Sequence, residues 1–215
     1  MPQANLEHIN SCDIFIVENL RSARRFLKKI GIQKDINELD FFEINKRTKK
    51  EDIPTYLSGA DSGKNIGVLS DAGCPGIADP GAEVVMWAHR KKINVIPLVG
   101  PSSILLALMA SGMNGQNFSF VGYLPKNKNQ RIKKIKQLEQ LSKTTTQTQI
   151  FIETPYRNNH LFEDLVANCN QETSIAIACD LTLPSQYIRC LKAKQWKSKK
   201  PNLYKKPCIF LLHKY

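Results

Sequence analysis

The segment from Val68 to Ser103 constrains the fold more than any other part of this chain. A β-branched run ends at Leu69, and a loop rich in Gly, Pro and Asp follows it. An expected helix, Ala82–Lys91, then leads into a second apolar run, Ile93–Leu98, and a Gly-Pro-Ser-Ser turn. This order of elements is typical of a parallel α/β sheet. Both loops follow the carboxyl ends of strands, where open α/β sheets bind ligands, and their composition suits close approach of main chain to a ligand.

The pattern of apolar residues predicts helices and strands on both sides of this segment. In the first part of the chain, we expect helices over Leu6–Ser11, Arg21–Ile30, Asp52–Gly59, Ala82–Lys91 and Ser102–Ser111, and strands over Asp13–Val17, Asp40–Ile44, Asn65–Leu69 and Ile93–Leu98. In the later part, we expect helices over Asn129–Leu141 and Arg157–Asn168, and strands over Gln149–Glu153, Thr173–Asp180, Gln186–Ala193 and Pro207–His213. We predict two α/β domains, residues 1–113 and 114–215, joined by a hinge over Asn114–Gly122.

The positive charge is concentrated in the second predicted domain. The 215 residues carry a net charge of +12; residues 1–113 hold 14 Lys and Arg against 13 Asp and Glu, and residues 114–215 hold 17 against 6. A polyanion such as RNA is the partner that this distribution favours, and a basic surface without a partner is the alternative. The candidate RNA contacts are four residues of the helix expected over 129–141: Arg131, Lys133, Lys134 and Lys136.

Several classes of protein do not fit this sequence. No apolar run approaches the ~20 residues of a membrane span, and the N-terminus lacks the basic and apolar regions of a secretory signal. The six cysteines form no C-x-x-C pair and several lie in apolar runs, so we expect reduced, buried thiols in a cytoplasmic protein rather than disulfides or zinc. The four histidines show no ligand spacing, and we expect no metal site.

A series of motifs carries a family resemblance. In one order the chain contains SDAGCPGIADPG (Ser70–Gly81), PLVGPSS (Pro97–Ser103) followed by ALMASG, GYLPK (Gly122–Lys126), FIETPYR (Phe151–Arg157) and PCIFLL (Pro207–Leu212). From about residue 5 to its end, the chain resembles the tetrapyrrole methylase superfamily of S-adenosylmethionine enzymes. Within that superfamily it is most similar to the ribosomal RNA small subunit methyltransferase I branch.

The resemblance implies a fold, an activity and a set of site residues. The fold would have a mostly parallel N-terminal sheet and a mixed C-terminal sheet, with the cofactor cleft between the two domains. The activity would be methyl transfer from S-adenosylmethionine to a ribose 2′-hydroxyl of 16S ribosomal RNA in the 30S subunit, by a homodimer. The residues implied to bind the cofactor are Ser70, Asp71, Ala72, Gly73, Pro75, Ala78, Ser102, Ser103, Thr154, Tyr156, Ala178 and Pro207.

This chemistry needs little from the protein beyond positioning. The sulfonium of the cofactor already activates the methyl group, so no metal ion or covalent nucleophile is required. A ribose hydroxyl is a poor nucleophile, so a proton acceptor would help, and Glu18 is the candidate. Relatives carry Glu-Asp-Thr-Arg here, whereas this chain has Glu18-Asn19-Leu20-Arg21, with one carboxylate fewer.

At three places in these motifs, a structural role is an alternative to contact with cofactor or substrate. The carboxylate of Asp71 would equally suit a bond to its own backbone in a turn. Ser102 would also suit the N-cap of the helix that follows it. Glu153 and Arg157 would form an ion pair rather than contact substrate.

The resemblance also implies a first strand, followed by a Gly- or Asn-containing loop, ahead of the helix expected over Leu6–Ser11. The sequence does not contain them, which indicates either a truncated start or a degenerate paralogue. Three functions therefore stay open: an RNA methyltransferase, a methylase of a tetrapyrrole, and a non-catalytic paralogue that binds RNA or another partner.

Overall fold

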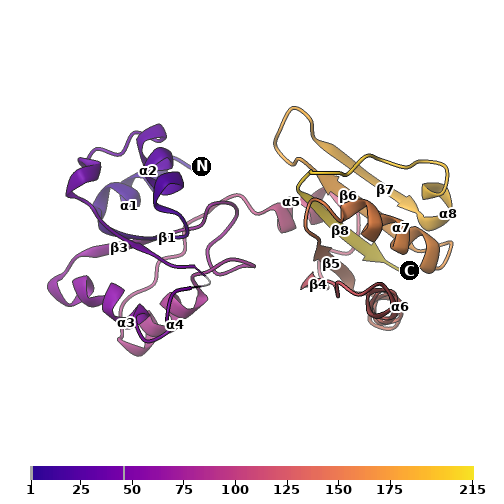
Figure 1. Ribbon diagram of the computed structural model, residues 1–215, viewed down its shortest axis with the longest axis horizontal. Helices are drawn as coiled ribbons and strands as arrows, with labels where there is room; N and C mark the ends of the chain where they lie inside the picture. Colours follow the sequence, from indigo (N-terminus) through magenta and orange to yellow (C-terminus); the bar gives the residue numbers. More distant parts are fainter. Residues whose placement is uncertain (1, 46) are drawn as a thin grey trace. The chain divides into compact units, whose positions relative to one another are not determined.

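The computed structural model describes residues 2–45 and 47–215. The chain divides into two compact units, and the boundary between them in the sequence falls between Ser102 and Ser103. Figure 1 shows the ribbon of the chain with its elements labelled. The first unit contains α1 (Ala4–Ser11), β1 (Cys12–Val17), α2 (Leu20–Lys29), η1 (Ile36–Glu38), β2 (Asp40–Glu43), α3 (Ile53–Tyr56), η2 (Ser58–Ser62), β3 (Asn65–Leu69) and α4 (Ala82–Arg90). The second contains α5 (Ser103–Ser111), β4 (Phe118–Tyr123), α6 (Lys128–Thr145), β5 (Thr148–Ile152), α7 (Asn158–Asn168), β6 (Ser174–Cys179), β7 (Tyr187–Lys192), α8 (Ala193–Trp196) and β8 (Cys208–His213).

The first unit is built on a parallel sheet with the strand order β2-β1-β3. β1 is its central strand, and both of its faces are covered. Phe15 packs with Leu27 in one cluster with α1 and α2, whereas Ile16 packs with Ile53 and Val84 of α3 and α4. Figure 1 shows the two pairs of helices on opposite sides of β1 and β3. This burial on both faces explains why β1 reads as a continuous apolar run.

The prediction of a strand over Ile93–Leu98 is wrong. Ile93 and Val95 do pack into the cluster with α4, but Ile96 and Leu98 are 57% and 42% exposed. A strand also needs a hydrogen-bonded neighbour, and none of the described strands pairs with this run. The apolar pattern therefore predicted the buried side chains of this run correctly, but it could not show that the run lacks the hydrogen-bonded neighbour of a strand.

The second unit is built on a mixed sheet with the order β4-β5-β8-β6-β7, in which only β4 and β5 are parallel. Successive residues of its central strands alternate between two clusters. Ile177 and Phe210 face the helices α6, α7 and α8, whereas Ala178 and Ile209 face α5. The two sheets together confirm the predicted fold class, a parallel N-terminal and a mixed C-terminal sheet.

Two elements near the domain boundary differ from the expectation. The Asn114–Gly122 segment is not only a hinge, because Phe118–Tyr123 forms β4 alongside β5. Its alternation of aromatic and small residues is the strand signal that sequence reasoning missed. The structure also divides the chain after Ser102 rather than after Met113, because α5 packs against β6, β7 and β8.

The expectation that all six cysteines are reduced thiols is also wrong. Cys179 of β6 and Cys208 of β8 form a disulfide. The antiparallel register places these residues directly opposite each other, which spacing in the sequence alone does not reveal. The other cysteines, Cys12, Cys74, Cys169 and Cys190, are free.

Arg131 has a structural role. Its side chain is 8% exposed, and its Nη2 lies 2.6 Å from Oδ2 of Asp164, while Nη1 donates to the carbonyl of Lys126 at 2.9 Å. Arg131 thereby joins α6 to α7 and to the loop before α6. Lys133 and Lys136 are exposed and Lys134 is partly exposed, so these three residues carry the RNA-binding hypothesis for this helix.

We expect Asp164→Ala to lower the free energy of unfolding by about 3–5 kcal/mol, because it leaves the buried Arg131 guanidinium without its counter-charge. Urea denaturation followed by circular dichroism measures the change. Glu163→Ala is the matched control. The Glu163 side chain is 58% exposed, and its Oε1 lies 3.9 Å from Lys200 Nζ, so this ion pair is a weak surface contact. The control should cost less than about 1 kcal/mol. Equal losses in the two variants would contradict this role of Arg131.

Candidate functional site

The parallel sheet brings Glu18 and the Ser70–Gly81 loop together. β1 and β3 end at the same edge, and the backbone N–H of Asp71 donates to Oε2 of Glu18 at 3.3 Å. Glu43 lies at the end of β2, on the same edge, and its Oε1 accepts from the N–H of Leu20 at 2.9 Å. This edge therefore presents several carboxylates beside a loop.

The loop is folded tightly on itself by its own groups. Ser70 Oγ donates to Asp79 Oδ2 at 2.9 Å, and the N–H of Gly76 donates to the carbonyl of Pro80 at 3.1 Å. Sequence reasoning missed Asp79, because the fold of the loop, rather than spacing in the sequence, brings its carboxylate to Ser70. Ser70 is partly buried by these contacts. The cofactor-binding candidates exposed along the rest of the loop are Asp71, Ala72, Gly73, Pro75 and Ala78.

Three glycines and one alanine of this loop have positive φ: Gly73, Gly76, Ala78 and Gly81. Gly81 and Gly73 differ in their surroundings. At Gly81, with φ of 131°, an added Cβ would lie 3.1 Å from the nitrogen of Gly76 and 3.4 Å from Cβ of Pro75. At Gly73, with φ of 81°, a Cβ would meet nothing within 4 Å. Gly81 is thus needed for the internal fold of the loop, whereas the main chain at Gly73 faces open space.

Asp71 is available to a ligand. Its side chain is exposed, and within the described part of the chain its carboxylate accepts no hydrogen bond, including from its own backbone. The structure thus does not use Asp71 as a turn-forming residue. The hydrogen bond from its backbone N–H to Glu18 fixes the position of the main chain from which the free carboxylate extends.

The second predicted bend lies beside the first. Cys74 Sγ donates to the carbonyl of Pro101 at 3.7 Å, which joins the Ser70–Gly81 loop to the turn before α5. Ser102 is partly buried, and Ser103 is the exposed first residue of α5. Pro101 thereby lies beside the loop whose Asp71 N–H contacts Glu18.

In the second unit, the sheet register gathers the remaining candidates at one edge. Thr154 follows β5, Pro207 precedes β8, and Ala178 pairs with Ile209 near the end of β6. Tyr156 is 64% exposed, whereas Ala178 is 1% exposed and lies in the core. The side chain of Ala178 therefore cannot reach a ligand, and Ala178 contributes to this edge only by pairing with Ile209 in the sheet.

Glu153 and Arg157 form the expected ion pair. Their side chains meet at 2.5 Å between Oε1 and Nη2, and the Nε of Arg157 donates to Thr154 Oγ1 at 3.1 Å. The carboxylate of Glu153 is fully buried. These contacts fix the turn that carries Thr154 and Tyr156.

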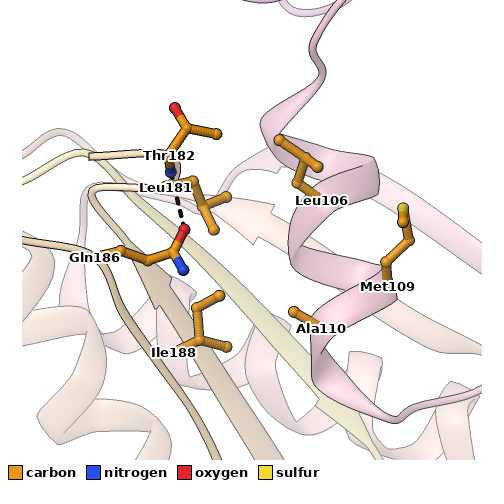
Figure 2. Close-up of a pocket in the computed structure, with 7 residues that line it drawn as sticks. All are labelled: Leu106, Met109, Ala110, Leu181, Thr182, Gln186 and Ile188. Carbon is orange, nitrogen blue, oxygen red and sulfur yellow. Dashed lines mark hydrogen bonds between the residues drawn. The ribbon is translucent and has the colours of Figure 1, made fainter. Parts of the chain in front are cut away.

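A pocket of about 330 Å³ lies beside the same end of β6, between α5 and the β6–β7 turn (Figure 2). Its lining residues are mostly apolar: Leu106, Met109, Ala110, Leu181, Thr182, Gln186 and Ile188. Gln186 Oε1 accepts from the N–H of Thr182 at 2.9 Å, so the polar groups at this turn are partly committed to each other. None of the sequence candidates lines this pocket, and the apolar surface of α5 was the available signal.

The described residues hold no cluster of metal-ligating side chains, and two of the free thiols are buried. Across residues 2–45 and 47–215, no three His, Cys, Asp or Glu side chains lie close enough together to hold a metal ion. Burial raises the pKa of the Cys12 and Cys169 thiols, which keeps both protonated at neutral pH. In the described part of the chain, no helix has the length and apolar character that a membrane span needs.

Comparisons with known proteins agree with this arrangement. The chain is 28% identical over 216 residues to ribosomal RNA small subunit methyltransferase I of Vibrio cholerae, covering 99% of this chain and 72% of that protein. It is 32% identical over 173 residues to the protein of the same name from Halalkalibacterium halodurans, covering 77% of this chain and 57% of that protein. No family model matches the chain.

Solved structures show the same fold at low sequence identity. The methyltransferase CobJ superposes with a TM-score of 0.64 at 15% identity, covering 99% of this chain and 87% of that one. Cobalt precorrin-4 methyltransferase, CbiF, superposes with a TM-score of 0.63 at 13% identity, covering 99% and 88%. The chain therefore has the fold of these methyltransferases, and in sequence it is similar to ribosomal RNA small subunit methyltransferase I. Its similarity to ribosomal RNA small subunit methyltransferase I confirms the branch that the motifs indicate.

A substitution at Gly81 tests whether the tight fold of the Ser70–Gly81 loop requires a residue without a Cβ. We expect Gly81→Ala to lower the free energy of unfolding by about 1–3 kcal/mol, because its positive φ and the contact with Gly76 strain any side chain. Thermal melting with and without S-adenosylmethionine measures the change. In Gly115→Ala, the control, the Cβ meets nothing within 4 Å. Indistinguishable melting of the two variants would show that the loop does not need this approach.

Proposed function

We propose that this chain is an S-adenosylmethionine-dependent methyltransferase that acts on a ribose 2′-hydroxyl of 16S ribosomal RNA in the 30S subunit. The observation that carries the proposal is the Ser70–Gly81 loop, which folds at the carboxyl ends of β1 and β3 and leaves its main chain and Asp71 exposed. The sequence relatives of this chain are ribosomal RNA small subunit methyltransferases by name.

The groups at this edge fit the cofactor. S-adenosylmethionine supplies a methyl group already activated on a sulfonium, and it presents a ribose diol, an adenine and an amino-acid tail. The free carboxylate of Asp71 can accept hydrogen bonds from hydroxyls or an ammonium group. The main chain at Ala72 and Gly73 can approach a ligand closely, because a Cβ at Gly73 would point into open space.

The further cofactor contacts stay predictions. Pro75 and Ala78 complete the same loop, and Ser102 and Ser103 follow the turn that Cys74 reaches. We place Thr154, Tyr156 and Pro207 in the second unit's share of the site, with Ala178 in a supporting position in β6.

Glu18 is the residue that we assign as proton acceptor. It directly follows the buried strand β1, and the N–H of Asp71 holds its Oε2. A carboxylate so placed can take the proton of a ribose hydroxyl as the oxygen attacks the methyl carbon. The same N–H orients Glu18 and begins the cofactor loop, which would couple the positions of base and cofactor.

Charge supports an RNA substrate. Lys133, Lys134 and Lys136 lie on α6, in a unit with a large excess of positive charge, and would contact phosphates. We also propose a cytoplasmic homodimer, as the resemblance implies. A second candidate function, methylation of a small tetrapyrrole, is favoured by the fold likeness to cobalt precorrin-4 methyltransferase.

Two assays on the full chain distinguish these functions. We expect calorimetry to detect binding of S-adenosylmethionine, and we expect radiolabelled methyl transfer to 30S subunits but not to uroporphyrinogen III. Transfer to uroporphyrinogen III alone would favour the tetrapyrrole function. Failure to bind the cofactor at millimolar concentration would favour a non-catalytic paralogue.

Glu18→Gln should slow methyl transfer by about 100-fold or more, because it removes the proton acceptor, while cofactor affinity stays near that of the wild type. Single-turnover rates on 30S subunits measure the effect. Glu51→Gln removes a different exposed carboxylate of the same unit and should leave the rate unchanged. A Glu18→Gln rate within a fewfold of wild type would remove Glu18 from the mechanism.

A further inference from the structure

The segment from Lys192 to Lys206, which connects β7 through α8 to β8, carries seven lysines and no acidic residue. Three of these lysines have carboxylate partners, and they pair as Lys194 with Glu172, Lys200 with Glu163 and Lys206 with Asp180. Lys197 and Lys199 are exposed and have no ion pair among the described residues. The segment therefore carries positive charge that no carboxylate compensates, and this charge is additional to that of helix α6.

Two exposed tyrosines meet at the end of this segment. The rings of Tyr156 and Tyr204 lie edge to face, with centroids 5.9 Å apart and planes at 74°. The two residues are 64% and 49% exposed. The Nζ of Lys205 lies 5.3 Å from the Tyr204 ring and 5.9 Å from the Tyr156 ring. A cation and two aromatic rings are thus gathered on a surface rather than in the core.

Hydrogen bonds hold this arrangement in place. The N–H of Lys205 donates to the carbonyl of Pro155 at 3.0 Å, and the N–H of Leu203 donates to Asn159 Oδ1 at 2.9 Å. Asn158 Nδ2 donates to the carbonyl of Lys206 at 2.7 Å. Leu203 itself is 1% exposed. The exposed rings therefore stand on a fixed backbone, which reduces the entropy that a bound ligand would have to remove.

We propose that Tyr204, which the Tyr156 ring supports edge to face, binds single-stranded RNA together with Lys205 and with Lys197 and Lys199 earlier in the same segment. An unpaired base stacks on an exposed tyrosine ring, and the lysines contact neighbouring phosphates. A duplex cannot use this surface in the same way, because its bases are stacked on each other. The proposal rests on the proposed function, since it assigns that enzyme's substrate a second contact surface beyond α6.

Tyr204 provides the test of stacking. With the full chain and a short fluorescein-labelled single-stranded RNA, fluorescence anisotropy should show that Tyr204→Ala binds about tenfold more weakly. Tyr204→Phe should bind within about twofold of wild type, because it keeps the ring. Tyr123→Ala, which removes a 60% exposed tyrosine from β4, is the matched control and should bind as wild type does.

Salt dependence separates stacking from charge. Tyr204→Ala should leave the slope of log affinity against log salt unchanged. The double variant Lys197→Gln/Lys199→Gln should reduce that slope by about 1.4, or roughly 0.7 for each lost phosphate contact. Circular dichroism confirms that each variant is folded.

Three results would overturn this surface: Tyr204→Ala binding like wild type, Tyr123→Ala losing as much affinity as Tyr204→Ala, or wild type binding the corresponding duplex as tightly as the single strand. These results are independent of the methyl-transfer assay. Methyl transfer to 30S subunits together with Tyr204-independent RNA binding would refute this surface alone. Tyr204-dependent RNA binding without methyl transfer would refute the methyltransferase and leave the surface standing.

Discussion

Parallel pairing of β1 with β3 is the constraint on which the functional part of this fold depends. The pairing aligns Ile16 with Val68 and Val17 with Leu69, so both strands end at one edge. Glu18 and the Ser70–Gly81 loop meet there because each directly follows its strand. A shift of the register by one residue would exchange the side chains of β1 between its two helix-covered faces and move the loop from Glu18. Burial of β1 thus fixes the geometry of the candidate site.

The second unit reaches a comparable result through a different topology. β8, the last strand, inserts antiparallel between β5 and β6. Its first residues consequently lie beside the ends of both neighbours. This single insertion brings Pro207 near Thr154 and places Cys208 opposite Cys179. Residues far apart in the sequence meet because the chain's end is the centre of the sheet.

Sequence reasoning predicted those parts of the molecule that local patterns determine. The bounds of β3 agree with the prediction, and α2, α4 and α7 differ from it by a residue or two at their ends, because caps and apolar periodicity are local properties. The loop motif also located Ser70 and Asp71 correctly at a strand end. The Ile93–Leu98 run shows the limit, since its composition suits a strand but pairing depends on a neighbour elsewhere in the chain.

The same limit applies to the site residues that depend on distant partners. Neither the disulfide between Cys179 and Cys208 nor the role of Asp79 follows from spacing, because the register and the fold of the loop decide them. The resemblance implies that Ala178 contacts the cofactor, but this residue faces the core, since a strand alternates its side chains between faces. Motif membership therefore predicted the neighbourhood of the site better than the exposure of each member.

Charge shows why the position of a residue matters more than its type. Arg131 belongs to a basic helix, yet it is buried against Asp164, whose carboxylate compensates its charge. Lys194, Lys200 and Lys206 are partly compensated by carboxylates. Lys205 instead lies over two exposed tyrosine rings. Phosphate contacts give affinity and set the course of the strand, whereas a base stacked on a fixed ring fixes the position of one nucleotide. An enzyme that must present one ribose hydroxyl to a methyl donor needs both, and this unit provides groups of each kind.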